Sequence, residues 1–375
     1  MHILILPSWY PDENNPVKGC FFREQAEALA RSGHRVSVFP YYADAEKGVY
    51  TERREICAGM TEYAVHYKSL PLHMTYFRLL REMTALVRAF PRNERPDVIH
   101  VHSFYAARYG AALKKLFHIP MVITEHATWF ERRLLSEQKL RDIKRDYAAA
   151  DALIAVSSGL RDVIAPLYPR EIRVVPNMVR ELFFASCRRP GEKEPFRFVA
   201  VGSLDEKKGT DILLSAFAKV LAEGRKATLT LCGGGDAEKY RRQARELGVS
   251  DSVRFTGQID REACAAILGE SHAFVLPSRF ETFGVVYAEA MARGLPIIMT
   301  KTNAWRELVT EETGMAVDIE DIPALRAAML SMMDHYDRYD PERIRTRCRE
   351  RYAPEQVCAR LTEIYSSLTA HGDGR

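Results

Sequence analysis

Short apolar runs alternate with segments of helical spacing along most of the chain. The first run, Ile3–Leu6, is followed by a polar loop and then by Cys20–Arg31, where apolar side chains recur at helical intervals. The next apolar run, Arg35–Phe39, completes a strand–helix–strand order. Because parallel strands need a crossover of this kind, the pattern predicts a doubly wound parallel sheet.

The alternation continues and predicts a second domain of the same kind. The further expected strands are 97–102, 118–124, 152–156, 172–175, 196–201, 227–231, 253–257 and 273–276. Residues 186–195 are rich in proline, glycine and charge and interrupt the series. With 375 residues the chain is long enough for two cores. We therefore expect one Rossmann-like α/β domain over residues 1–185, another over 186–353, and a final helix.

The stretch Pro277–Pro296 combines the end of an apolar strand, a polar loop with Glu281, and a helix with Glu289. The helix starts near Phe283 and Gly284, whose free N–H groups favour anions and sugar hydroxyls. Carboxylates accept hydrogen bonds from hydroxyls. Two glutamates eight residues apart also occur by chance in a Glu-rich chain, so the signal lies in the whole string.

That string closely resembles the signature of retaining GT-B glycosyltransferases of the family-four (group 1) type, in which seven residues separate two glutamates. The resemblance implies that Glu281 meets the donor sugar hydroxyls and Glu289 the nucleotide ribose. It further implies two Rossmann-like domains that face across a cleft, with a C-terminal helix, residues 354–371, crossing back to the first domain. The reaction it implies moves a sugar from a nucleotide diphosphate to a hydroxyl, with retention and without a metal cofactor.

A glycine-bounded turn with lysines follows the expected strand 196–201 and is suited to cradle phosphate. It resembles the family's Gly-Arg-Leu-x-x-x-Lys-Gly clamp, whose lysine matches Lys208. Ser203 stands where the family arginine usually lies. Lys207 and Arg279 are the candidates to replace that arginine; otherwise the diphosphate is held more weakly.

Three further donor contacts follow only from the resemblance. Gly19 matches the small-residue loop that approaches the diphosphate, and Gln258 and Ile259 lie where the family borders the base. The CGGGD string after the strand 227–231 lacks the G-x-G-x-x-G spacing, so it is not a dinucleotide fingerprint.

Histidines follow two expected strands of the N-terminal half, where ligands of open α/β sheets bind. The Thr-Glu-His string resembles the family loop whose histidine contacts the donor sugar, which makes His126 the third catalytic candidate beside Lys208 and Glu281. Acceptor candidates are His102, Trp129, Trp9 and Tyr10, although a capping histidine and core aromatics are equally open alternatives.

Composition limits the class of protein. The content of 47% hydrophobic and 28% charged residues is that of a soluble globular protein, and no apolar run is long enough to span a membrane. Seven cysteines without C-x-x-C pairs favour a reducing cytoplasm over disulfides or zinc. The N-terminal half is basic, and the expected helix 73–90 is basic and amphipathic. Both features suit peripheral contact with the inner face of a membrane, or simply a solvated surface.

We therefore expect a hexosyltransferase of cell-surface polysaccharide or glycolipid synthesis. Its partners would be a nucleotide sugar and a glycan or lipid-linked acceptor, and no nucleic acid. Two alternatives stay open: a GT-B nucleotide-sugar epimerase, and a catalytically weak nucleotide-sugar-binding subunit, which Ser203 in place of the arginine would favour.

Overall fold

A computed structural model of the chain describes residues 1–12, 15, 17–46, 48–68, 84, 95–185, 191 and 195–370. The chain forms two compact units. The first contains Met1–Val156, Arg161–Pro176 and the C-terminal residues from Pro354; the second contains Ser157–Leu160 and Asn177–Ala353. Residues 177–185, which the sequence assigned to the N-terminal domain, thus group with the second unit. The helix expected over residues 73–90 falls, except for Thr84, outside the described residues.

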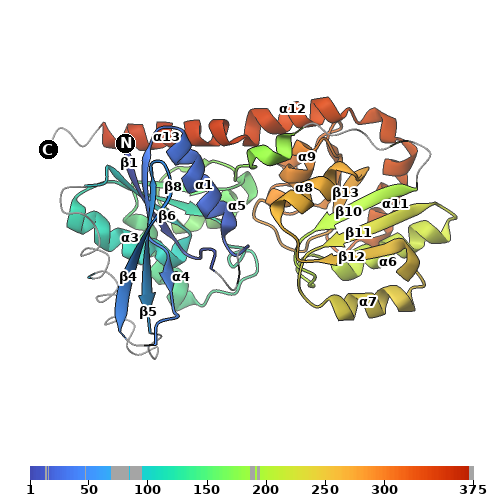
Figure 1. The fold of residues 1–375 in the computed structure, drawn as a ribbon, viewed down its shortest axis with the longest axis horizontal. Helices are drawn as coiled ribbons and strands as arrows, with labels where there is room; N and C mark the ends of the chain where they lie inside the picture. Colours follow the sequence, from blue (N-terminus) through green and yellow to red (C-terminus); the bar gives the residue numbers. More distant parts are fainter. Residues whose placement is uncertain are drawn as a thin grey trace. The chain divides into compact units, whose positions relative to one another are not determined.

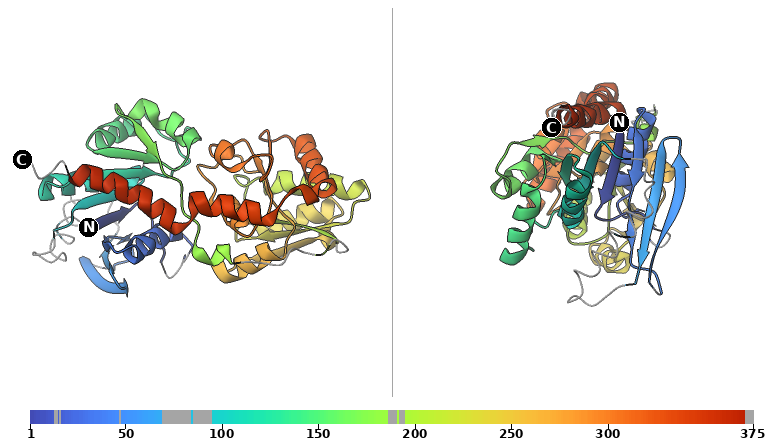
Figure 2. Two further views of the ribbon diagram at one scale, coloured as in Figure 1. Left: turned by 90° about the horizontal axis from the view of Figure 1, so that it is seen from above. Right: turned by 90° about the vertical axis from the view of Figure 1, so that its left-hand side faces the viewer.

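The first unit is built on one sheet, in the order β3-β5-β2-β1-β6-β7-β8-β9, with β4 paired to β5 (Figure 1). Its strands are β1 (His2–Pro7), β2 (Arg35–Val38), β3 (Tyr41–Tyr42), β4 (Val49–Cys57), β5 (Met60–Tyr67), β6 (Val98–His102), β7 (Met121–Glu125), β8 (Ala152–Ala155) and β9 (Ile172–Val174). All pairings are parallel except that of β4 with β5. This antiparallel hairpin lies at one edge of the sheet (Figure 2).

Among the described residues, four helices of the first unit connect strands of this sheet, and the C-terminal helix packs on it without connecting two strands. They are α1 (Cys20–Arg31), α3 (Phe104–Phe117), α4 (Glu137–Ala148), α5 (Ser158–Ile164), whose first turn belongs to the second unit, and α13 (Pro354–Thr369). Short 3₁₀ helices follow at Ala165–Leu167 and, in the second unit, at Glu181–Phe184, Ser250–Ser252 and Tyr336–Arg338. The C-terminal helix α13 packs on α1 and reaches the sheet, where the Tyr365 hydroxyl lies 2.6 Å from Nδ1 of His100. It therefore belongs to the first unit.

The second unit contains a six-stranded parallel sheet in the order β12-β11-β10-β13-β14-β15. Its strands are β10 (Phe196–Val201), β11 (Ala227–Cys232), β12 (Val253–Gly257), β13 (Ala273–Leu276), β14 (Ile297–Thr300) and β15 (Gly314–Val317). Its helices are α6 (Thr210–Ala222), α7 (Ala237–Glu246), α8 (Arg261–Gly269), α9 (Val285–Ala292), α10 (Trp305–Leu308), α11 (Ile322–Asp334) and α12 (Pro341–Tyr352). Helices α6 and α7 lie on one face of the sheet and α8 and α9 on the other (Figure 1).

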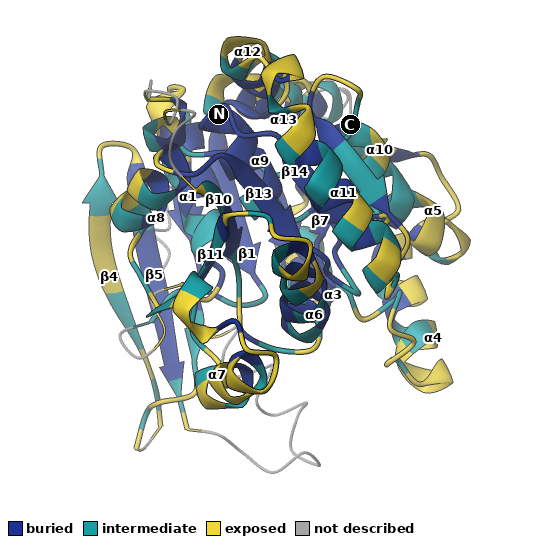
Figure 3. Ribbon diagram, turned by 90° about the vertical axis from the view of Figure 1, so that its right-hand side faces the viewer, coloured by how far each residue is buried: buried dark blue, intermediate teal, exposed yellow. Residues whose placement is uncertain are grey.

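Burial explains why these strands read as unbroken apolar runs. Every residue of β13 and β14 is buried, because helices cover both faces of the parallel sheet. Exposed residues gather instead on the outer sides of helices such as α7 and α12 (Figure 3). The expectation of two doubly wound parallel-sheet α/β domains is confirmed.

Candidate active site

The strand order of the second sheet reverses between β10 and β13. From β10 the chain runs outward through β11 and β12 and then returns to β13 on the other side of β10. At such a point the two following loops leave in opposite directions and open a crevice at the carboxyl ends of the strands, where open α/β sheets bind ligands. The loop after β10 carries Lys208, and the loop after β13 carries Glu281.

Lys208 and Glu281 form an ion pair at this point. The Lys208 ammonium group donates to Oε1 of Glu281, and both side chains are largely buried. The Ser278 hydroxyl donates to the same oxygen at 3.3 Å, and the backbone carbonyl of Glu281 accepts the N–H of Asn303 at 3.3 Å. Two residues 73 positions apart in the sequence are thus brought together. Their contacts with a donor remain predictions.

The turn that carries Lys208 is stabilised by Asp205. One carboxylate oxygen of Asp205 accepts the backbone N–H of Lys208 at 2.9 Å, and the other accepts the Ser203 hydroxyl at 2.6 Å. Ser203 therefore supports the turn through Asp205. Gly209, at φ +69°, ends the turn against β13: a Cβ there would lie 2.1 Å from the carbonyl oxygen of Pro277, so only glycine fits.

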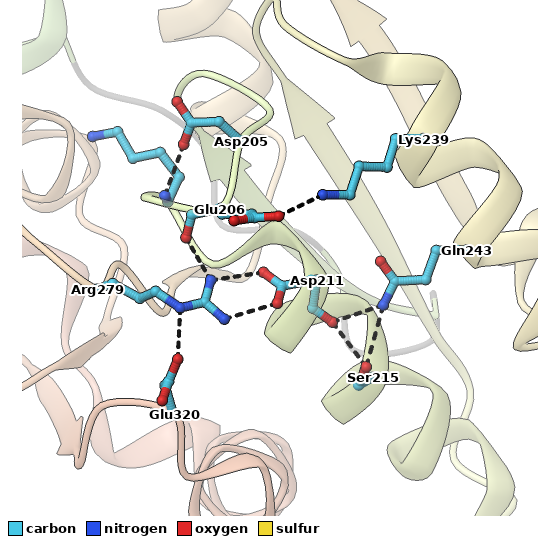
Figure 4. Close-up of polar contacts among 9 residues, drawn as sticks. Asp205, Glu206, Asp211, Ser215, Lys239, Gln243, Arg279 and Glu320 are labelled. Atoms are coloured by element: carbon cyan, nitrogen blue, oxygen red, sulfur yellow. Dashed lines mark hydrogen bonds and ion pairs between the residues drawn. The ribbon is translucent and has the colours of Figure 1, made fainter.

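Arg279 is already engaged within the protein (Figure 4). Its guanidinium donates to both carboxylate oxygens of Asp211, at 2.9 and 2.8 Å, to Glu320 at 2.8 Å, and to the carbonyl of Glu206. The hydrogen bonds with Asp211 raise the pKa of Arg279. These contacts do not support the expectation that Arg279 replaces the family arginine, because a phosphate would have to displace them. The backbone carbonyl of Lys207 accepts the backbone N–H of Arg279 at 2.8 Å. A phosphate contact through the Lys207 side chain remains a prediction.

Helix α9 begins directly after its N-cap residue Gly284, which follows Glu281 by three positions. Gly284 has φ +75°, and a Cβ there would lie 2.6 Å from the Tyr287 ring. Among the described residues no side chain caps the first turn, so its N–H groups are suited to an anion. The Phe283 side chain is buried and packs against Tyr352 with ring centroids 5.4 Å apart. This packing favours a donor contact through the Phe283 backbone over one through its side chain, and the contact itself stays a prediction.

Glu289 is fully buried on α9 and forms an ion pair with Arg261. Its second oxygen, Oε2, has no hydrogen-bond partner in the described part of the chain and can accept a hydroxyl. The sequence reasoning missed Arg261, which follows Gln258 and Ile259 by a few positions after β12. Gln258 is exposed and Ile259 half-buried, and both remain predicted base contacts.

The first sheet reverses its strand order between β1 and β6. His102 ends β6 and His126 follows β7; both are buried, and their rings share a hydrogen bond of 3.1 Å between Nδ1 of His102 and Nε2 of His126. One ring nitrogen donates and the other accepts, as neutral imidazoles do. Burial, with a smaller contribution from the neighbouring His100 and His126, lowers the pKa of His102 well below its usual value. The structure thus pairs His126 with His102, and its contact with a donor sugar remains a prediction.

The loop after β1 is held by aromatic contacts. Gly19, at φ +68°, lies so close to Trp9 that a Cβ would come within 2.7 Å of the indole and of the Trp9 carbonyl oxygen. Tyr10 is buried, and its hydroxyl donates to Oε1 of Glu62 at 2.6 Å, which does not support an acceptor contact; that contact stays a prediction. Trp9 is half-buried against Phe22, at a centroid distance of 5.3 Å. Its acceptor role and the diphosphate contact of Gly19 remain predictions.

Trp129 is 40% exposed and meets the ring of Tyr105 edge-on at 5.8 Å. Tyr105, also 40% exposed, lies in the first turn of α3, directly after β6. Tyr105 follows β6 and Trp129 follows β7, and these neighbouring strands also carry His102 and His126 at or just after their carboxyl ends. Sequence reasoning missed Tyr105, although its place two residues after Ser103 was a usable signal.

The described residues contain no group of three or more histidine, cysteine, aspartate or glutamate side chains arranged to hold a metal ion. Within the same residues, no helix combines the length and apolar character needed to cross a membrane.

Comparison with known sequences gives two family matches. The model of the family described as Glycosyltransferase Family 4 matches residues 21–181, and that of Glycosyl transferases group 1 matches residues 187–351. A glycogen synthase of Mycobacterium tuberculosis is 28% identical over 359 residues, which cover 89% of this chain and 86% of that protein. A D-inositol 3-phosphate glycosyltransferase of Corynebacterium urealyticum is 26% identical, with 93% of this chain and 90% of that protein covered.

Solved structures share the fold of the whole chain. Sucrose-phosphate synthase from Thermosynechococcus elongatus superposes with a TM-score of 0.80 at 22% identity, covering 99% of this chain and 100% of that one. The Anabaena protein HepE, in complex with UDP and glucose, gives a TM-score of 0.77 at 18% identity, covering 98% and 100%.

Proposed function

Because the chain belongs to the GT-B glycosyltransferases of the group 1 type, we propose that it transfers a hexose from a nucleotide diphosphate sugar to a hydroxyl acceptor with retention of configuration. It is a glycosyltransferase of the hexosyltransferase class. The proposal of a nucleotide diphosphate sugar as donor is carried by the Lys208–Glu281 pair, which lies where the strand order of the second sheet reverses.

This pair suits both halves of such a donor. When the bond between the anomeric carbon and the phosphate oxygen breaks, negative charge develops on the leaving diphosphate, and the Lys208 ammonium group stabilises it. The uncapped first turn of α9 adds partial positive charge from its N–H groups. The acceptor oxygen bonds to the anomeric carbon on the same face, and its proton passes to the leaving phosphate oxygen. No metal ion is part of this proposal, since Lys208 and α9 supply the positive charge.

Glu281 changes partner in this scheme. Without a donor its carboxylate neutralises Lys208. A bound diphosphate takes over the ammonium group and frees Glu281 to accept hydrogen bonds from sugar hydroxyls. Glu289, through its unpaired Oε2, is the corresponding acceptor for the ribose. His126 stays a proposed contact of the donor sugar.

The similar proteins support a nucleotide-sugar donor and leave the acceptor open. HepE was solved in complex with UDP-glucose, and another neighbour, a starch synthase, was solved with ADP and acarbose. The relatives named above include one glycogen synthase and one inositol phosphate glycosyltransferase, which differ in acceptor. We propose an acceptor of cell-surface polysaccharide or glycolipid synthesis, reached in the cytoplasm at the membrane's inner face through the basic N-terminal half.

One observation favours a second candidate, a nucleotide-sugar-binding subunit of low activity. Ser203 occupies the place of the family arginine, and Arg279 is engaged by Asp211. The arginine of the family pattern is thus missing from this turn, and Lys207 is the remaining candidate to replace it. An epimerase would instead convert a nucleotide sugar without any acceptor.

Mass spectrometry of the purified protein with UDP-, GDP- and ADP-sugars, with and without a lipid extract, separates these candidates. Acceptor-dependent release of one nucleoside diphosphate is the result expected of a transferase. A nucleotide sugar that changes without an acceptor and releases no diphosphate would identify an epimerase. If no sugar nucleotide is consumed but one raises the melting temperature, the binding subunit is correct.

Lys208→Ala is the variant that tests the pair. We expect turnover to fall by about 10²–10³-fold, as when one stabilising donor of a developing anion is removed. Lys219→Ala, an exposed lysine on α6, is the matched control and should leave turnover unchanged. Equal turnover in both variants would disprove the phosphate assignment.

A further inference from the structure

Glu125, the last residue of β7, is a fully buried carboxylate in the first unit. Five donors converge on it. Its Oε1 accepts the Ser103 hydroxyl at 2.6 Å and the backbone N–H groups of His126 and Ala127 at 2.8 and 2.7 Å. Its Oε2 accepts the N–H of Phe104 at 3.0 Å and the Tyr147 hydroxyl. One side chain thus joins the end of β7 to the start of α3 and to α4.

Ser103, which donates to this carboxylate, has an unusual backbone conformation. Its φ of 67° and ψ of 161° lie in a region that is populated almost only by glycine. A serine stays there only where neighbouring contacts over-determine the conformation. The Ser103 hydroxyl donates to Glu125, its N–H donates to the carbonyl of Thr124 at 2.7 Å, and its own carbonyl accepts the Ser8 hydroxyl at 3.2 Å.

Contacts with Glu125 set the course of both histidine segments. Ser103 directly follows His102, so its backbone decides how the chain turns from β6 into α3. The backbone N–H of His126 donates directly to the Glu125 carboxylate. The two imidazoles then meet in the hydrogen bond of 3.1 Å. A carboxylate that holds the backbone at both points also fixes the relative placement of the two rings.

We propose that Glu125 is the positioning residue of the histidine pair: it orients His126, through the backbone N–H groups and through Ser103, for its contact with the substrate. This assignment rests on the proposed function, in which His126 touches the donor sugar. Glu125 itself is closed off from solvent and acts only through its neighbours.

Glu125→Gln tests the proposal because it keeps the size of the side chain. The new amide group donates where the carboxylate accepted, so at least one of the converging donors loses its partner. The matched control is Glu62→Gln. Glu62 is also a buried carboxylate of the first unit that accepts a tyrosine hydroxyl, from Tyr10 at 2.6 Å, but it lies on β5 and holds neither histidine.

We expect Glu125→Gln to lower kcat by about 10–100-fold, as loss of an orienting partner does, with little change in donor KM. The control should stay within about threefold of the unchanged protein. Glu125→Asp, which keeps the charge on a shorter side chain, should recover part of kcat. A Glu125→Gln protein with normal melting and unchanged kcat would overturn the proposal.

A second readout does not depend on activity. Nuclear magnetic resonance of histidine-labelled protein, assigned with His126→Gln and His102→Gln, reports the ring signals of the pair. Both signals should shift in Glu125→Gln and stay in place in Glu62→Gln; unshifted rings would refute the positioning role. If Glu125→Gln does not fold, Ser103→Gly is the variant to use, because it removes one donor to Glu125 and glycine adopts this backbone conformation readily. The histidine ring signals should then shift by a smaller amount, and unshifted signals would likewise refute the positioning role. If the unchanged protein consumes no nucleotide sugar, the proposed function fails while this readout still decides the role of Glu125.

Discussion

Replacing Arg279 by alanine removes the side chain that ties two loops of the second unit together. Its guanidinium holds Asp211 through two hydrogen bonds and also reaches Glu320. Hydrogen bonds to charged groups contribute about 1.5–3 kcal/mol when shielded from water, whereas exposed ion pairs contribute about 0.2–1 kcal/mol. The Asp211 side chain is one-third exposed and Glu320 mostly exposed. We therefore expect Arg279→Ala to lower the free energy of unfolding by about 2 kcal/mol.

Urea denaturation followed by circular dichroism measures this change, and a double-mutant cycle assigns it. Arg279→Ala and Asp211→Ala should couple by about 1 kcal/mol, because each removes the partner of the other. Arg326→Ala is the control: its ion pair with Glu223 also lies in the second unit, but both side chains are 40% exposed. That variant should lose less than about 1 kcal/mol.

The stability difference should also depend on pH. Burial alone would raise the pKa of Asp211, but the hydrogen bonds and charge of Arg279 outweigh it and hold the pKa below its usual value. A carboxyl group with a lowered pKa stabilises the folded state above its unfolded pKa, about 4. Its contribution is lost as the pH falls from there through the lowered value. The difference between the unchanged protein and Arg279→Ala should therefore shrink below about pH 4.

Two results would refute this reasoning. An unchanged free energy of unfolding in Arg279→Ala, with no coupling to Asp211, would show that the contacts do not stabilise the fold. Alternatively, unchanged stability with about a hundredfold weaker nucleoside diphosphate binding would make Arg279 a phosphate ligand, as the sequence suggested.

Two further predictions concern single contacts. Gly209→Ala should destabilise the second unit by more than about 1 kcal/mol, since the added Cβ meets Pro277 and the residue has φ +69°. Gly224→Ala is the control, because Gly224 also has a positive φ but no atom lies within 4 Å of its Cβ position. Equal losses of stability in the two variants would contradict a steric effect at Gly209. Trp129→Ala should raise the KM for an oligosaccharide acceptor by about tenfold, because an exposed aromatic ring packs on the apolar face of a sugar; Tyr50→Ala on β4 is the exposed aromatic control, and an unchanged KM would exclude Trp129.

The fold was predictable because buried parallel strands leave a plain signal. A run such as β13 carries no polar residue on either face, so its length and apolar character suffice to find it. The β4–β5 hairpin was less clear, since its outer strand alternates weakly and is mixed in charge. Sequence reasoning read that region only as short strands and loops, whereas β4 has nine residues and β5 eight.

The pairing of Lys208 with Glu281 was predictable in part for the same reason. Both follow parallel strands, and the carboxyl ends of parallel strands meet at one edge of a sheet. What the sequence could not supply was the partner of each polar side chain. Arg261 lies beside Glu289 only because α8 and α9 cover the same face of the sheet, and the Arg279–Asp211 pair depends on the contact of the loop after β13 with the first turn of α6.

These partners change what each candidate residue can do. An arginine near a phosphate turn is a natural substitute for a missing one, yet Arg279 supports the turn from outside through Asp211 and the Glu206 carbonyl. Ser203, which looked like a lost ligand, donates to Asp205 and so helps to hold the backbone N–H of Lys208. Asp205, Ser203 and Arg279 therefore all support the turn that carries the Lys208 ammonium group. In the proposed scheme a donor diphosphate takes over the Lys208 ammonium group, whose charge Glu281 otherwise balances, so phosphate binding and release of Glu281 for the sugar hydroxyls would be a single event.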